Sequence, residues 1–290
     1  MPPMSPILLA LDTSTSVASV ALVTPPSAGN AENGDNTAIH EARLLAELTW
    51  LVGQRHSVEL LERLEWLMAS AGVTMADLTG VAVALGPGSF NGVRVALATA
   101  KSLAFARNVP LIGTPTLDVI AWGYSATHGF THGSAYGADA GTVCAILEAG
   151  RGQVYAATYD AMTDAARWTP LDGYQVTTAA ELAERLPGAV FFCGEMAPAT
   201  RATLAETFGG RCRFAARLDE RRASWLAELA LARLAQGRYD DAMALEPLYL
   251  RRPAITTSAR HRLAAPEDAD ETRQRKDAPG GEESSDALRR

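Results

Sequence analysis

The first residues that could do chemistry follow the first apolar run of the chain. After Ile7–Leu11 come Asp12, Thr13, Ser14 and Thr15. Hydroxyls and backbone amides at a turn between strands can cradle a phosphate, and an aspartate there can order a metal-bound water. The same residue types also form turns in which Asp and Ser side chains bond to their own backbone. The local pattern favours the turn and leaves the nucleotide or anion loop open.

A glycine-rich stretch is the second candidate for an anion-binding loop. Gly86, Gly88 and Gly92 allow positive φ and close backbone approach, and the loop opens a predicted helix. Ser89 lacks the Gly-x-Ser-x-Gly spacing of a nucleophile elbow, and no histidine lies near it in sequence to act as a base. No Lys-Ser/Thr pair follows, as a Walker loop requires. The stretch therefore predicts either an anion-binding loop or a tight turn from strand to helix.

Two histidines have the spacing of a metal pair. On a helix, His128 and His132 would share one face and could bind a metal ion. Gly129 and Gly133 disfavour a helix, and no acidic third ligand is close in sequence. We therefore expect a loop here and no metal site.

Small residues recur along a predicted helix, Val93–Arg107, and would let another helix approach to the lower end of the usual ~8–10 Å spacing. The preceding helix, Gln54–Gly72, carries Trp66 beside its apolar stripe, which would suit an interface core if exposed. Both helices could pack on the chain's own sheet, bind a partner, or do both. The predicted partner-facing residues are His56, Glu59, Leu60, Arg63, Leu64, Arg94, Ala96, Leu97, Ala100, Lys101 and Ala104.

The spacing of apolar residues predicts the elements that position these motifs. The first set is strands Ile7–Thr13, Ser16–Val23 and Ala42–Trp50, helix Gln54–Gly72, strand Gly80–Leu85, helix Val93–Arg107, strand Pro110–Gly113 and helix Thr116–Tyr124. The second set is strands Thr142–Leu147, Gln153–Tyr159 and Tyr174–Thr177, helix Ala179–Leu186, strand Ala189–Cys193, helix Ala199–Phe208 and a terminal helix, Ser224–Gln236. The repeated order of three strands, helix, strand, helix predicts two similar α/β lobes.

Length and composition agree with two domains. The 290 residues approach the limit of one hydrophobic core, and 48% hydrophobic with 20% charged residues is typical of a globular protein. A net charge of −7 argues against strong nucleic-acid binding by this chain alone. We place the lobes at 1–112 and 113–258, the second including the terminal helix. The remainder, 259–290, has no aromatic residue and dense charge, which predicts a disordered tail.

The pattern of cysteines and charges bears on the compartment. Cys144, Cys193 and Cys212 are odd in number and widely spaced, so neither a disulfide framework nor a zinc site is indicated. The first basic residue is Arg43, whereas a signal peptide begins with a basic region. The uncharged stretch 119–138 holds too many glycines and polar residues to cross lipid. We expect a cytoplasmic protein with no membrane contact.

Six motifs in order resemble the TsaB (YeaZ) family. They are Ile7–Ser14, the His56–Glu59 segment, Gly86–Arg94, Pro110–Leu117, Gly152–Tyr155 and Glu246–Arg251. The likeness covers about Ile7–Arg252, and the Gly86–Arg94 motif is highly specific. It implies an α/β, actin-like (ASKHA) fold with two duplicated βββαβα lobes. It also implies a non-catalytic subunit of the bacterial machinery that makes threonylcarbamoyladenosine in tRNA.

The resemblance further implies the partners. The two first-lobe helices would pack on the equivalent helices of a catalytic paralogue, TsaD, in a heterodimer. TsaD would transfer the threonylcarbamoyl group to the adenosine 3′ of the anticodon. An ATPase, TsaE, would join the larger complex, and the chain would form a homodimer when alone. ATP or ADP and a metal ion are expected only in the partner subunits or at the shared interface, and no intrinsic cofactor is expected in this chain. The tRNA would be contacted mainly through the complex.

Departures from the catalytic paralogue support this interpretation. TsaD carries a His-x-x-x-His metal pair at positions that fall here on about Thr116 and Ile120, neither of which replaces imidazole as a ligand. The alternative is an enzyme in its own right. It would be an ATP- or metal-dependent transferase that uses Asp12 and the Gly86–Gly92 loop, or a glycoprotease-like peptidase that uses Ser89 or the two loop histidines.

Overall fold

The structure of the chain is a computed structural model that describes residues 6–25, 42–52, 56–127, 141–216 and 220–251. The chain divides into two units, Met1–Arg251 and Arg252–Arg290, and the fold concerns the first of them. The predicted tail at 259–290 and the histidines His128 and His132 lie outside the described residues.

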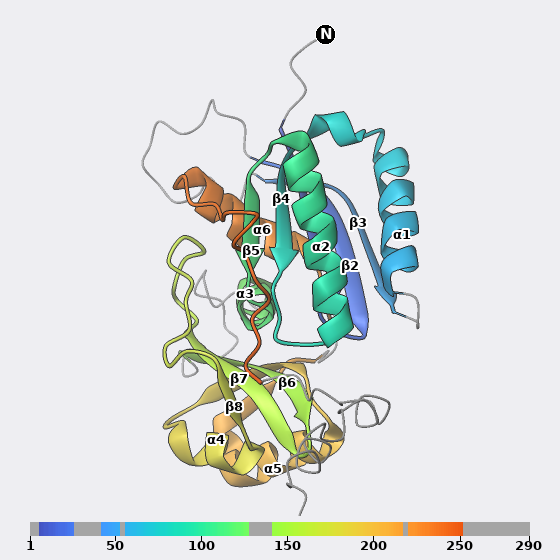
Figure 1. The fold of residues 1–290 in the computed structure, drawn as a ribbon. Helices are drawn as coiled ribbons and strands as arrows, with labels where there is room; N and C mark the ends of the chain where they lie inside the picture. Colours follow the sequence, from blue (N-terminus) through green and yellow to red (C-terminus); the bar gives the residue numbers. More distant parts are fainter. Residues whose placement is uncertain (1–5, 26–41, 53–55, 128–140, 217–219, 252–290) are drawn as a thin grey trace, which may run out of the picture. The chain divides into compact units, whose positions relative to one another are not determined.

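The first half of the chain forms a mixed five-stranded sheet with helices packed on it (Figure 1). Its elements are β1 (Ile7–Asp12), β2 (Val17–Thr24), β3 (Arg43–Leu51), α1 (His56–Ala71), β4 (Leu78–Ala84), α2 (Phe90–Arg107), β5 (Leu111–Thr114) and α3 (Thr116–Thr127). The strand order is β3-β2-β1-β4-β5. Strands β1, β2 and β3 pair antiparallel, whereas β4 pairs parallel with β1 and β5.

The second half repeats this topology. Its elements are β6 (Thr142–Gly150), β7 (Gln153–Asp160), β8 (Gln175–Thr177), α4 (Ala179–Arg185), β9 (Val190–Glu195), α5 (Pro198–Phe208), β10 (Cys212–Phe214) and α6 (Ala223–Ala235). The sheet order is β10-β9-β6-β7-β8, with the same parallel and antiparallel pairs. The duplicated α/β architecture is confirmed. In each repeat the βββαβα order is followed by one more strand and one more helix, of which the sequence predicted β5, α3 and α6 but not β10.

Alternation along the central strands explains their continuous apolar character. In β1, Ile7, Leu9 and Leu11 join a core cluster with α1 and α2, while Leu8 and Ala10 join a second cluster with α3 and α6. Because both faces of the strand are covered, every position from Ile7 to Leu11 is apolar rather than every second one. The same division places a third cluster between β6, β7 and β9 and the helices α4 and α5.

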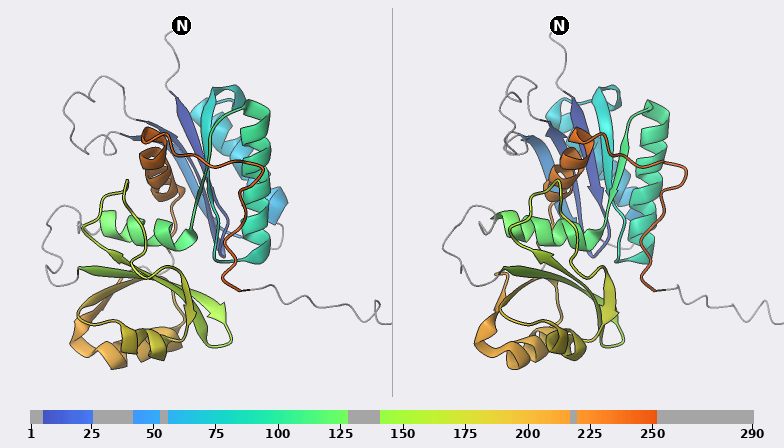
Figure 2. Two further views of the ribbon diagram at one scale, coloured as in Figure 1. Left: turned by 60° about the vertical axis from the view of Figure 1, so that its left-hand side comes forward. Right: turned by 90° about the vertical axis from the view of Figure 1, so that its left-hand side faces the viewer.

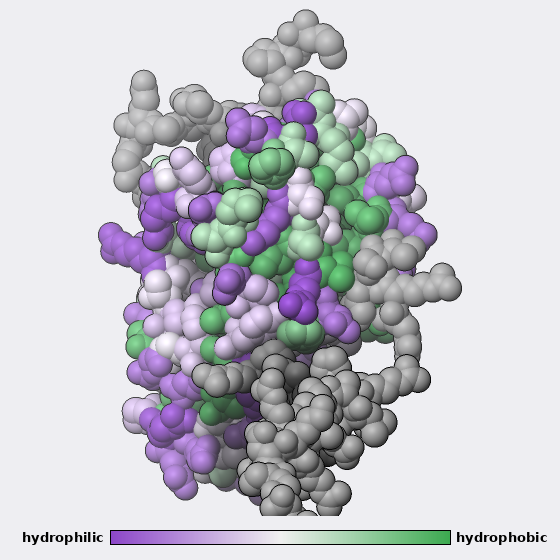
Figure 3. Space-filling model, in the orientation of Figure 1, coloured by the Kyte–Doolittle hydropathy of each residue, from purple (hydrophilic) through white to green (hydrophobic). Residues whose placement is uncertain are grey.

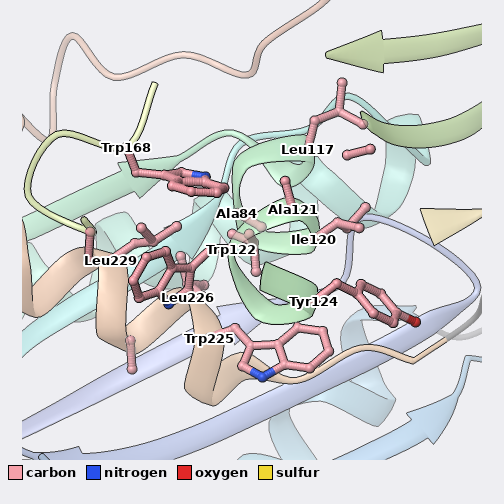
Figure 4. Close-up of a cluster of buried hydrophobic side chains, with 14 of the residues drawn as sticks. Ala84, Leu117, Ile120, Ala121, Trp122, Tyr124, Trp168, Trp225, Leu226 and Leu229 are labelled. Carbon is pink, nitrogen blue, oxygen red and sulfur yellow. The ribbon is translucent and has the colours of Figure 1, made fainter. Parts of the chain in front are cut away.

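The helices α3 and α6 form the core between the two sheets (Figures 2 and 4). They approach closely at Gly123, where an added Cβ would lie 1.9 Å from the Trp225 ring. We grouped the terminal helix with 113–258 by sequence order, but α6 packs against the strands of the first sheet. Its buried residues, among them Leu226 and Leu229, share a cluster with Leu8 and Ala82. The lobe boundaries themselves stay a prediction.

After α6 the chain returns along the first sheet (Figure 1). Asp240 forms a β-bridge with Leu111 at the free edge of β5, and its carboxylate accepts from the Gly113 N–H at 2.7 Å. Tyr249 then stacks on Phe90 at the start of α2, with ring centroids 5.4 Å apart. This segment covers an edge that would otherwise expose unpaired backbone groups.

Candidate functional site

The structure brings the two predicted loop motifs together. The Asp12–Thr15 turn at the end of β1 lies against the Gly86–Gly92 loop that leads into α2. The Ser89 N–H donates to the Ser14 carbonyl oxygen at 2.6 Å. The Thr13 hydroxyl donates to the Gly92 carbonyl oxygen, also at 2.6 Å. The polar groups of the two motifs therefore bond to each other.

This backbone contact explains two glycines of the loop. A Cβ at Gly88 would lie 1.9 Å from the Ser14 carbonyl oxygen, and one at Gly92 would lie 1.9 Å from that of Thr13. Ser89 is the N-cap of α2, and its hydroxyl accepts from the Gly92 N–H at 3.2 Å. The glycines are thus required for chain packing, and the serine satisfies a helix terminus.

Asp12 forms the turn that its sequence context favoured. Its Oδ1 accepts from the Ser14 backbone N–H at 2.9 Å and from the Ser14 hydroxyl at 2.6 Å. Its Oδ2 lies 3.4 Å from the guanidinium of Arg221, a residue distant in sequence. The carboxylate is therefore fully engaged by groups of the chain itself.

A cleft opens beside the two motifs. It is a cavity of about 590 Å³ lined by Ser14, Thr15, Ser16, Gly88, Ser89, Leu147, Glu148, Glu195 and Met196. Among the described residues, the lining holds two glutamates and no basic residue. Glu148 Oε1 accepts from the Ala197 N–H and from the Thr200 hydroxyl, both at 2.8 Å, at the start of α5. These charges disfavour a phosphate group in the cleft.

The two positions at which the resemblance predicted the absence of a metal pair, Thr116 and Ile120, lie in the core. Thr116 and Ile120 are buried in α3, and the Thr116 hydroxyl accepts from the Gly86 N–H at 3.1 Å. Within the ranges that the structure describes, no group of three or more His, Cys, Asp or Glu side chains could hold a metal ion.

Six residues of the predicted partner surface lie in the core instead. Ala96, Leu97, Ala100 and Ala104 of α2 and Leu60 and Leu64 of α1 are all buried in one cluster with strands of the first sheet. The small side chains let α2 lie close to its own sheet, so they cannot contact a partner in this fold. This corrects the predicted partner-facing set for these six positions.

The remaining predicted residues also lie on α1 and α2. Arg94 is exposed and its guanidinium sits 4.5 Å from the Phe90 ring centroid, whereas Arg63 sits 5.0 Å from that of Trp50. Glu59 and Lys101 are partly buried. His56 is the first residue of α1.

The two helices expose large apolar residues on their outer faces. Trp66 is 61% exposed and Leu61 56% exposed on α1, and Phe105 is 79% exposed on α2. Figure 3 shows apolar side chains over this part of the surface. Trp66 is thus exposed, which was the condition for its serving in an interface core. The apolar spacing of the predicted helix Gln54–Gly72 placed Leu61 on its buried stripe, and the exposure of Leu61 corrects this. Phe105 was not singled out from the sequence.

Several arginines of the Arg211–Arg222 segment pair with the chain's own groups. Arg222 lies 2.9 Å from Glu220 and 3.7 Å from Glu47. Arg211 donates to the Gly188 carbonyl oxygen and lies over the Phe208 ring. The part of this basic segment that the structure describes is thus largely held by intramolecular contacts.

One further result concerns membranes. Over the described residues, none of the helices combines the length and the apolar character needed to cross a bilayer.

Comparisons with known proteins agree with the family resemblance that the motifs indicate. The family model described as "TsaD: tRNA N6-adenosine threonylcarbamoyltransferase" matches residues 50–259. The tRNA threonylcarbamoyladenosine biosynthesis protein TsaB of Escherichia coli is 30% identical over 152 residues, covering 52% of this chain and 54% of that protein. Its Haemophilus influenzae namesake is 32% identical over 148 residues, covering 51% of each chain. The chain thus spans about half the length of these curated relatives.

Solved structures extend the likeness over more of the fold. YeaZ from Pseudomonas aeruginosa has 25% identity and a TM-score of 0.61, with 84% of this chain and 100% of that chain covered. A second P. aeruginosa structure, described as similar to peptidase YEAZ, has 26% identity and a TM-score of 0.64, with 85% and 100% covered. The resemblance to TsaB and YeaZ is confirmed. Because the family model matches most of its length, the chain belongs to the family described as TsaD, tRNA N6-adenosine threonylcarbamoyltransferase.

Proposed function

We propose that this chain is a non-catalytic subunit in the biosynthesis of tRNA threonylcarbamoyladenosine, and that it binds a catalytic TsaD-type paralogue through α1 and α2. The carrying observation is the exposure of Trp66, Leu61 and Phe105 on two adjoining helices whose opposite faces are buried. Aromatic side chains that lose all contact with water are the residues that most often dominate binding energy. The names of the curated relatives support the pathway.

The rest of the assembly follows from this role. TsaD carries out threonylcarbamoyl transfer to the adenosine 3′ of the anticodon, and TsaE joins the larger complex. ATP or ADP and a metal ion belong to the partner subunits or to the shared interface, and tRNA is bound mainly through the complex. The chain works in the cytoplasm and forms a homodimer when alone. The negative net charge of −7 supports leaving most tRNA contact to a partner.

Introduction of a negative charge on the exposed helix faces tests the interface. Trp66→Glu and Phe105→Glu are each expected to weaken binding to the TsaD paralogue of the same genome by about 30-fold or more, as loss of a hot-spot aromatic does. Gel filtration with light scattering should show a one-to-one heterodimer for the wild type and separate elution for the variants.

The matched control is Leu171→Glu, because Leu171 is 59% exposed and lies outside both helices. This variant should bind the paralogue as the wild type does. Equal binding by Trp66→Glu, or equal loss with Leu171→Glu, would place the interface elsewhere.

A second prediction separates scaffold from peptidase. Ser89→Ala should leave threonylcarbamoyladenosine formation intact in a reconstituted complex, because the Ser89 hydroxyl caps a helix. Loss of the cap is expected to lower stability by about 1 kcal/mol. Modified adenosine in tRNA is quantified by nucleoside mass spectrometry, with urea unfolding measured in parallel. Abolished modification by a folded variant would favour a catalytic serine.

A further inference from the structure

A buried arginine lies between carboxylates from the two sheets. Arg221 Nη1 is 3.4 Å from Asp12 Oδ2 at the end of β1, and its Nη2 is 2.9 Å from Glu195 Oε1 at the end of β9. The same Nη2 lies 3.4 Å from the Thr15 hydroxyl. The side chain of Arg221 is 1% exposed and that of Asp12 0%. The guanidinium thus connects the end of β1 in the first sheet with the end of β9 in the second.

Because Arg221 is buried, its ion pairs with Asp12 and Glu195 affect the stability of the fold. Removing a cation from water costs several kcal/mol, and its ion partners must offset that cost. The Nε of Arg221 has no hydrogen-bond partner among the described residues, so the two ion pairs must offset its desolvation as well. If the cation is removed, Asp12 is left as an uncompensated buried charge. A surface ion pair, by contrast, contributes little.

The backbone beside Arg221 is fixed to the first sheet. The Ala223 N–H donates to the Ser19 hydroxyl at 2.9 Å, and the Ser224 N–H donates to Glu47 Oε1 at 2.8 Å. Ser19 lies on β2 and Glu47 on β3. Since the chain is anchored there, the pair with Glu195 is a bond from the first repeat to the second.

A second charged side chain at the cleft, of opposite sign, is also held by groups of the chain itself. A helix N-terminus attracts anions, and at α5 this position is taken by the Glu148 carboxylate, which accepts from Ala197 and Thr200. Two charged groups beside the cleft are therefore held by the chain itself. Glu148 is part of the lining, and the buried Arg221 contacts the lining residues Thr15 and Glu195.

We propose that Arg221 is a built-in cation that fastens the two lobes across the cleft, so that the cleft keeps its geometry without a bound metal ion or nucleotide. Arg221 is a positioning residue in this role: it holds Asp12 and Glu195 in place. The inference concerns the isolated chain and does not depend on the proposed partner.

Hydrogen exchange read by mass spectrometry tests the proposal on the full chain. In Arg221→Met, amides around Asp12–Ser16, Glu195 and the start of α6 are expected to exchange about tenfold faster or more, because both repeats are released at this point. Amides in the outer helices α1 and α4 should keep their wild-type rates. The matched control is Arg167→Met, which removes an exposed arginine 3.8 Å from Asp164 and should change neither region.

Adding a metal ion distinguishes a role of Arg221 that depends on its positive charge from a role in packing alone. Excess Mn²⁺ should restore slow exchange in Arg221→Met, whose two carboxylates lack their counter-ion, and should leave the wild type unchanged. Unchanged exchange in Arg221→Met, a uniform rise over the whole chain, or Mn²⁺-dependent protection of the wild type would each overturn the proposal.

If Arg221→Met does not fold, Glu195→Gln replaces it, because the amide still accepts a hydrogen bond while the charge across the lobes is lost. The same amides should then exchange several-fold faster, again without a change in α1 and α4. Wild-type exchange in Glu195→Gln would overturn the proposal in that case.

Discussion

Gly92→Ala is expected to lower the free energy of unfolding by more than about 4 kcal/mol, enough to unfold a marginally stable chain. The added Cβ would lie 1.9 Å from the Thr13 carbonyl oxygen, a backbone atom that no change of rotamer can move. Thr13 is buried, and its hydroxyl is bonded to the Gly92 carbonyl oxygen at 2.6 Å. Relief would require α2 to move away from the end of β1, which breaks the contact between the two loop motifs.

Urea unfolding followed by circular dichroism measures this effect, and Gly210→Ala is the matched control. Gly210 lies in a short 3-10 helix, and a Cβ there would meet no atom within 4 Å. The unfolding free energy of Gly210→Ala should stay within about 0.5 kcal/mol of the wild-type value. Equal midpoints for the two alanine variants would show that the close approach at Gly92 is not rigid.

Most of the architecture was predictable because local patterns and tertiary structure agree. The apolar run at the start of the chain predicted β1, and the predicted helix Val93–Arg107 matches α2 except that α2 begins at Phe90. The strand β10 was missed. It has three residues, lies between a glycine pair and a charged segment, and is held by pairing with β9, which no local pattern reveals.

The candidate site was less predictable, since its geometry depends on contacts between distant residues. The glycines of Gly86–Gly92 were compatible with an anion loop or a tight turn, and the structure supplies a backbone contact that accounts for two of them. The face of α2 with small side chains could have packed on a partner or on the chain's own sheet, and the burial of Ala100 shows that it packs on the sheet. Arg221 was visible only as one arginine of a basic segment, because its partner Asp12 is 209 positions away.

A buried carboxylate that the sequence did not single out carries the last prediction. Asp118 Oδ1, on α3, accepts hydrogen bonds from the Tyr159 hydroxyl at 2.7 Å and the Tyr174 hydroxyl at 2.9 Å. Burial raises the pKa of Asp118 from 3.8 to about 6, although the two tyrosine hydrogen bonds and the nearby Arg233 act to lower it. Arg238 lines the same small cavity.

The direction of the pH effect follows from this raised pKa. Below the unfolded value of 3.8 the carboxyl is protonated in both states and imposes no charge-burial penalty. Between 3.8 and about 6 the unfolded chain ionises first, so folding stability falls as pH rises. Above about 6 the full penalty is present, and the shift of roughly two pH units corresponds to about 3 kcal/mol.

Asp118→Asn is therefore expected to raise the unfolding free energy at pH 8 by up to about 3 kcal/mol and to change it little at pH 3.5. The amide oxygen can still accept from Tyr159 and Tyr174, so the hydrogen bonds persist while the buried charge disappears. Urea unfolding of the wild type and of Asp118→Asn across this pH range gives the difference in unfolding free energy. The contributions of the other carboxylates are the same in both proteins and cancel in this difference. The control is Asp172→Asn, which removes an exposed carboxyl group and should change the unfolding free energy by no more than about 0.5 kcal/mol. A flat difference for Asp118→Asn as well would mean that its carboxyl ionises in the folded chain as readily as in the unfolded one.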